Sequence, residues 1–121
     1  MYDSTGDEME KIVEQGMLYD FYGELLTPHQ RKIYEDVVFN DMSLSEIAEE
    51  QGISRQGVHD LIKRCDRILA GYEKKLRMVE KFNQTKRMVE EIKTLAGTYK
   101  KNGDMSLIDR IEAISEEIGQ L

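Results

Sequence analysis

One stretch, residues 43–64, constrains the fold more than any other part of the chain. Ser43 is followed three residues later by Glu46, which is the pattern of a capping box at the start of a helix. Gly52 then stands where a helix can end in the left-handed conformation, and Ser54 can cap a second helix. The spacing therefore predicts two short helices hinged at Gly52, which is a helix-turn-helix.

Each predicted helix has an apolar face with three- and four-residue spacing. The residues on these faces are Leu44, Ile47 and Ala48 in the first helix, and Val58, Leu61, Ile62 and Cys65 in the second. We expect both helices to pack on a common core through these faces. The opposite side of the second helix is left polar.

The polar side of the second helix carries long side chains that can donate hydrogen bonds to base edges or phosphates. The candidate nucleic-acid-binding residues are Arg55, Gln56, His59, Lys63, Arg64 and Arg67. Helix pairs with a glycine turn also occur as purely structural units. The combination of caps, glycine turn, Ser-Arg pair and apolar spacing is more restrictive, and it favours a nucleic-acid-binding ancestry.

The distribution of charge supports the same segment, although the net charge is −7. Residues 1–50 carry three Lys or Arg against thirteen carboxylates, whereas residues 51–101 carry thirteen Lys or Arg against six carboxylates. Residues 102–121 are acidic again. Positive charge thus begins at the second helix, where contacts with phosphates are expected. The alternative is that these cations only keep a long helix solvated. It fits residues 73–101, where the charges are mixed in sign, better than residues 55–67.

Other segments predict an all-α chain with the helix-turn-helix at its centre. Residues 1–7 lack periodicity and predict a flexible lead-in, and helices are expected over residues 8–26 and from the cap at Thr27 to about Phe39. After Arg64 the helical pattern continues, with a break expected near residues 83–85 and a last helix starting at Ser106. The expected division is a helix-turn-helix domain over residues 8–72 and a helical extension over residues 73–121.

The extension carries an apolar stripe that needs a cover, because isolated amphipathic helices are marginally stable in water. The candidate dimerisation residues are Leu76, Val79, Phe82, Val89 and Ile92. A second copy of the chain is the favoured cover, since a symmetric dimer also sets two recognition helices side by side. The alternative is that the extension folds back on its own core.

The sequence gives no support for catalysis, a cofactor or a metal site. Cys65 is the only cysteine, and its place on the apolar stripe predicts an inert core thiol. His29 and His59 lack further ligands at metal-binding spacing, and no glycine-rich phosphate loop is present. We find neither a secretory signal nor a stretch long and apolar enough to cross a bilayer. We therefore expect a cytoplasmic protein that is not an enzyme.

Two families resemble this pattern. Residues 26–63 resemble the fourth conserved region of bacterial sigma factors in the Leu-Thr opening, the Ser-Leu before Glu-Ile-Ala, the glycine turn and the Ser-Arg pair. Residues 10–80 resemble more closely the YlxM family of small helix-turn-helix proteins of Gram-positive bacteria. The motifs that carry this likeness are Tyr19-Asp20-Phe21-Tyr22, Leu25-Leu26-Thr27, residues 43–64, Ile68-Leu69, Tyr72-Glu73 and Leu76.

The YlxM resemblance implies an all-helical DNA-binding fold whose carboxyl-terminal helices associate, no catalytic activity, and a link to the signal recognition particle pathway. The sigma-factor likeness implies base contacts by Arg55, Gln56, His59 and Lys63. Gly57 departs from that pattern, because a residue with a side chain is usual there and a glycine loosens the first helical turn. Two functions are therefore expected: a DNA-binding regulator, or a non-enzymatic adaptor that binds the RNA of the particle or its GTPase through the basic face or the acidic first helices.

Overall fold

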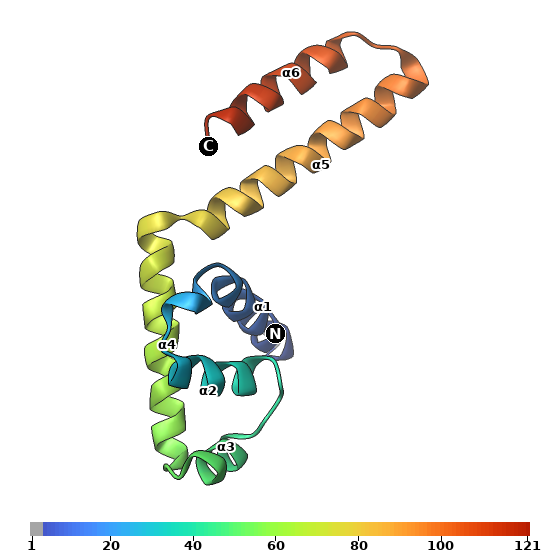
Figure 1. Cartoon of the computed structure of the whole chain (residues 1–121). Coiled ribbons are helices and arrows are strands. Elements are labelled where there is room, and N and C mark those ends of the chain that lie inside the picture. Colours follow the sequence, from blue (N-terminus) through green and yellow to red (C-terminus); the bar gives the residue numbers. More distant parts are fainter. Residues whose placement is uncertain (1–3) are drawn as a thin grey trace. The chain divides into compact units, whose positions relative to one another are not determined.

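The computed structural model describes residues 4–121 and the side chains from Met9 onward, so residues 1–3 of the expected lead-in lie outside the described residues. The elements, shown in Figure 1, are α1 (Ser4–Tyr22), the 3-10 helix η1 (Gly23–Leu25), α2 (Pro28–Val38), α3 (Leu44–Gln51), α4 (Arg55–Leu76), α5 (Met78–Asn102) and α6 (Ser106–Gly119). No strand occurs among the described residues, and the predicted all-α class is confirmed. The chain forms two compact units, one ending at Arg77 and the other spanning Met78–Leu121.

The predicted caps of the helix-turn-helix are present. The hydroxyl of Ser43 accepts a hydrogen bond from the backbone N–H of Glu46 at 3.1 Å, and the Glu46 carboxylate accepts one from the Ser43 N–H. Gly52 ends α3 with φ of 68°, and the Ser54 hydroxyl accepts from the Gly57 N–H at 2.9 Å at the start of α4. Two helices thus meet at a left-handed glycine, as the spacing predicts.

The cap of α2 also follows the predicted pattern. The Thr27 hydroxyl accepts from the Gln30 N–H at 3.2 Å, and the Gln30 side chain accepts from the Thr27 N–H at 3.0 Å. Pro28 occupies the first helical position, where its missing N–H leaves no intrahelical bond unmade.

One buried cluster of the first unit lies between α2, α3 and α4, beside further buried residues that include Leu18 and Tyr22 of α1. Its buried residues Ile33, Ile47, Ala48 and Val58 come from all three helices. Partly buried apolar residues pack around them; these are Val37, Met42, Leu44, Leu61 and Ile62. α4 supplies core residues from one side and carries polar residues on the opposite side. Burial of the apolar side therefore turns the polar side of α4 towards solvent.

Both ends of α1 differ from the sequence prediction. α1 begins at Ser4 instead of residue 8, so the helix includes residues that the sequence assigns to the lead-in. It ends at Tyr22, and η1 replaces the predicted helical turn at residues 23–25. A Cβ at Gly23 would lie 2.8 Å from ring atoms of Tyr19, so this turn requires a residue without a side chain.

The predicted break near residues 83–85 was wrong, because the helix ends at Leu76 and Arg77 adopts the left-handed conformation with φ of 55°. The Arg77 N–H donates to the Glu73 carbonyl at 2.8 Å, which closes the last turn of α4. Lys74 and Lys75 in that turn complement the negative end of the helix dipole. Thr85 instead lies inside α5, where its hydroxyl donates to the Lys81 carbonyl.

The second unit is a helical hairpin of α5 and α6 with the turn at Gly103, whose φ is 66°. α6 begins at Ser106 as predicted, and Asp104 caps this end: its carboxylate accepts from the Ser106 N–H at 3.0 Å and from the Ser106 hydroxyl at 2.7 Å. These bonds hold the pKa of Asp104 below its usual value. Ile114 is fully buried in the hairpin, and Arg110 joins Glu91 across it at 3.2 Å.

Candidate nucleic-acid interface

The recognition helix α4 is held in place by hydrogen bonds that reach across the first unit. Asp66 accepts from the Tyr34 hydroxyl at 2.7 Å and from the Gln15 amide at 2.9 Å. These two bonds join α4 to α2 and to α1. Tyr34 is fully buried, and burial raises the pKa of its hydroxyl.

The apolar side of α4 is buried and also holds the helix in place. Val58, Cys65 and Leu69 are all fully buried. Burial raises the pKa of Cys65 to about 11, so the thiol stays protonated at neutral pH. This agrees with the expected inert core thiol.

The structure leaves all six predicted nucleic-acid-binding residues exposed on α4; these are Arg55, Gln56, His59, Lys63, Arg64 and Arg67. At 3.6 residues per turn, Arg55, Gln56, His59 and Lys63 fall within a sector of about 100°. Arg67 lies beside this sector and Arg64 farther round the helix. We name the sector, with Arg67, the recognition face.

The amino-terminal end of the recognition face is hollowed. Arg55, Gln56 and His59 line this hollow together with Leu44 of α3, and its volume is about 390 Å³. Three of the four expected base-contacting residues therefore share one concave surface. The N-terminal turns of a recognition helix are the part that commonly contacts base edges.

One acidic residue interrupts the cationic surface. Asp60 accepts a hydrogen bond from the Gln56 amide at 2.8 Å, and its carboxylate lies 3.7 Å from Nδ1 of His59. In the described part of the chain, Arg55, Lys63, Arg64 and Arg67 have no carboxylate partner within ion-pair distance. The cations are therefore available to an outside anion, whereas Gln56 already has a partner.

Gly57 has a local explanation in the cap of α4. A Cβ at this position would lie 3.1 Å from the Ser54 hydroxyl oxygen, which is closer than most such contacts. The same oxygen accepts from the Gly57 N–H. A glycine lets the cap close tightly, so this first turn is fixed by a hydrogen bond despite the low helix propensity of glycine.

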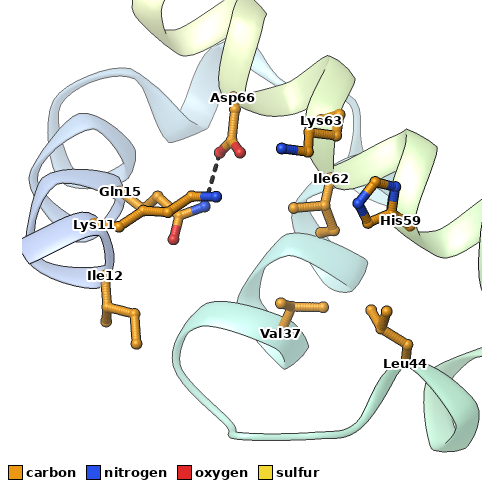
Figure 2. Close-up of a pocket in the computed structure, with 9 residues that line it drawn as sticks. All are labelled: Lys11, Ile12, Gln15, Val37, Leu44, His59, Ile62, Lys63 and Asp66. Carbon is orange, nitrogen blue, oxygen red and sulfur yellow. Dashed lines mark hydrogen bonds between the residues drawn. The ribbon is translucent and has the colours of Figure 1, made fainter. Parts of the chain in front are cut away.

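A groove beside the recognition face was not predicted from the sequence. It has a volume of about 320 Å³ and brings residues of α1 and α2 next to Leu44 and α4 (Figure 2). Its lining residues are Lys11, Ile12, Gln15, Val37, Leu44, His59, Ile62, Lys63 and Asp66. Lys11 is the residue that sequence analysis missed, since it lies in the acidic half of the chain. The only sequence signal for its role is that Lys11 lies on the same side of the predicted helix as Ile12 and Gln15, which also line the groove.

The expected dimerisation residues belong to both units. Leu76 ends α4 and is 48% exposed, while Val79, Phe82, Val89 and Ile92 lie on α5. Phe82 and Val89 are about half exposed, and Val79 and Ile92 are partly buried. None of the residues of α5 is fully buried.

The described residues contain no group of three or more His, Cys, Asp or Glu placed to hold a metal ion. None of the helices in the described part of the chain combines the length and apolar character that crossing a bilayer requires.

Comparison with known proteins identifies the family of this chain. Residues 9–110 match the model of a family described as "Putative helix-turn-helix protein, YlxM / p13 like". The UPF0122 protein YlxM of Bacillus subtilis is 39% identical over 107 residues, which cover 88% of this chain and 97% of that protein. A UPF0122 protein of Acetivibrio thermocellus is 42% identical over 114 residues, covering 91% and 97%. One of Anoxybacillus flavithermus is 41% identical over 108 residues, covering 88% and 98%.

The matched residues include α2, α3, α4 and α5, and thus both the recognition face and the start of the hairpin. The identities run over nearly the full length of each relative. The chain belongs to the YlxM/p13-like helix-turn-helix family.

Proposed function

We propose that this protein is a DNA-binding regulator that uses the recognition face of α4. One observation carries the proposal: one sector of α4 exposes Arg55, Gln56, His59 and Lys63. The helix is capped by Ser54, and its opposite side is buried in the core. Arg55 and Lys63 can contact phosphate or guanine, Gln56 adenine, and His59 either donor or acceptor groups. Arg64 and Arg67 are assigned to phosphates, which position the helix without selecting sequence.

A homodimer fits this function. Two copies of α4 related by a two-fold axis would contact two half-sites one helical turn apart. The apolar residues of α5, in particular Val89 and Ile92, are the proposed contact. The half-exposed Val89 supports this assignment, because association would remove its side chain from water.

The cellular role is proposed from likeness alone. The YlxM resemblance supports a part in the signal recognition particle pathway, either by regulating it or by taking part in it. A cytoplasmic location is proposed on a different ground, because the single free thiol of Cys65 suits a reducing compartment.

A selection from random duplex DNA with the full-length protein tests the first proposal, followed by titrations at several salt concentrations. Arg55→Ala and Lys63→Ala should each cost about 1–3 kcal/mol on the selected site and relax its sequence preference. Arg67→Gln should weaken all sequences alike and reduce the salt slope by about 1. Lys74→Gln, in the last turn of α4, is the control for loss of one charge. An affinity that does not change with salt contradicts the proposal.

A second candidate is a non-enzymatic adaptor that binds the RNA of the signal recognition particle or its GTPase. Within this reading Asp60 favours the GTPase as the partner, because a carboxylate beside the recognition face opposes the phosphates of DNA and RNA alike and occupies Gln56. Chromosomal footprinting and RNA crosslinking from one culture separate the two candidates. Enrichment of the particle RNA without discrete chromosomal sites supports the adaptor.

A further inference from the structure

The groove beside the recognition face has an apolar floor and a cationic rim. Ile12, Val37, Leu44 and Ile62 supply the apolar side chains, and they come from all four α-helices of the first unit. Figure 2 shows Lys11 and Lys63 entering the groove from opposite walls, with the floor residues between and below them. An apolar surface framed by a few polar groups is the usual construction of a small-molecule site.

The polar groups of the groove are unequally satisfied. Asp66 accepts hydrogen bonds from both Tyr34 and Gln15, so its carboxylate is already engaged. Lys11 and Lys63 have no ion-pair partner among the described residues. Two ammonium groups against one carboxylate leave a single positive charge in the lining. One negative charge from a ligand would neutralise it.

We propose that this groove binds a small monocarboxylate with a branched aliphatic or aromatic body. The carboxylate would accept from the ammonium groups of Lys11 and Lys63, and the apolar body would cover Ile12, Val37, Leu44 and Ile62. A volume of about 320 Å³ accommodates a ligand of this size, at the small end of the range for ligand sites. A larger anion would extend beyond the floor into solvent.

The ligand would also act on nucleic-acid binding, and this consequence alone rests on the proposed function. His59 and Lys63 line the groove and belong to the recognition face. A carboxylate paired with Lys63 removes one cation from the surface that faces phosphate. Ligand and DNA therefore compete, and by linkage each weakens the other by the same factor.

Methyl NMR of the full-length protein tests the binding directly, without nucleic acid. The probes are 4-methylpentanoate and phenylacetate, each compared with its neutral amide. We expect saturable shifts of the methyl signals of Ile12, Val37, Leu44 and Ile62, with a Kd of about 1 mM or tighter, and no shift of the Ile114 methyls. The amides should bind about tenfold more weakly, because they cannot pair with the lysines.

Lysine variants test the role of the rim. Lys11→Met and Lys63→Met should each weaken binding of the acids about threefold, and the double variant about tenfold. Lys75→Met, an exposed lysine of α4 outside the groove, is the matched control and should leave the Kd unchanged. Equal binding of acid and amide, equal loss in the control, or absence of saturable shifts with both acids overturns the proposal.

A DNA titration then separates this proposal from the proposed function. Saturating phenylacetate should lower the affinity of the wild-type protein for its selected DNA site about threefold. Lys11→Met, which keeps its full recognition face, should need about threefold more phenylacetate for the same effect. Methyl shifts without any DNA binding retain the carboxylate site and refute the DNA function. DNA binding without methyl shifts retains the DNA function and refutes the carboxylate site.

Discussion

At the scale of single residues, a buried carboxylate ties the end of α2 to the turn before the helix-turn-helix. Asp36 is 2% exposed and accepts from the Asn40 amide at 2.9 Å and from the Lys32 ammonium at 2.9 Å. Its carbonyl accepts from the Met42 N–H at 3.0 Å. The bonds from Asn40 and Lys32 lower the pKa of Asp36 despite its burial.

This lowered pKa predicts a stability that depends on pH. A carboxyl group whose folded-state pKa lies below its unfolded value stabilises the fold above the unfolded value, and this contribution is lost as pH falls through the folded pKa. Asp36→Asn should reduce the free energy of unfolding by about 1 kcal/mol at pH 7, since half-exposed Lys32 is screened by solvent. Urea unfolding between pH 7 and pH 3 measures it. The difference between the two proteins should shrink towards pH 3, and a constant difference contradicts the assignment.

Residues differ in how far the sequence reveals their role. Thr27, Ser43 and Ser54 could be assigned as caps because each bonds to a residue three positions away. Asp66 could not be recognised as an anchor, because Gln15 and Tyr34 lie 51 and 32 positions away. Lys11 was missed for the same reason, since only the packing of α1 brings it to the groove beside Lys63.

At the scale of elements, two glycines of the first unit predict opposite effects of the same substitution. Gly52 has φ of 68°, Gly71 lies inside α4, and a Cβ would contact nothing within 4 Å at either position. Gly52→Ala should destabilise the protein by about 1 kcal/mol, because a side chain disfavours the left-handed conformation. Gly71→Ala should stabilise it by about 1 kcal/mol through helix propensity. Chemical denaturation compares them, and shifts of the same sign refute this account.

The position of Asp60 beside the recognition face predicts that removing its charge strengthens DNA binding. Asp60→Asn deletes a charge that repels phosphate and keeps an oxygen for the Gln56 amide. Affinity should rise about fivefold at low salt and less at high salt. Fluorescence anisotropy with the selected duplex measures it.

Asp20→Asn, an exposed carboxylate of α1, controls for the change in net charge. An equal gain in this control would assign the effect to net charge alone. A loss of affinity in Asp60→Asn would instead show that Asp60 orients Gln56 for a base contact.

Element boundaries were predictable where the sequence carries caps and glycines, and not elsewhere. The starts of α2, α3 and α4 and the turn at Gly52 follow such signals. The break after Leu76 has none, because Arg77 adopts a conformation that an arginine rarely takes. An apolar spacing that continues across the break cannot show that two helices meet there.

At the scale of the whole molecule, the division into two units at Arg77 gives the hairpin its own stability problem. Ile114 is the one fully buried residue of α6, and α5 has none. Two helices bury only one side of each other, so apolar residues on the remaining sides stay in contact with water. Val89 is 50% exposed and Met105 is 63% exposed.

Association of two copies through α5 would cover Val89, and this predicts a charge-sensitive dimer. Val89→Asp should shift the protein towards monomer, weakening association at least tenfold, because a buried carboxylate without a partner is strongly unfavourable. Thr94→Asp adds the same charge on another side of α5 and should leave association unchanged. Sedimentation equilibrium over a wide concentration range measures both. A wild-type protein that stays monomeric throughout, or equal dissociation of the two variants, excludes the α5 dimer, and half-site recognition would then require a different arrangement of the recognition helices.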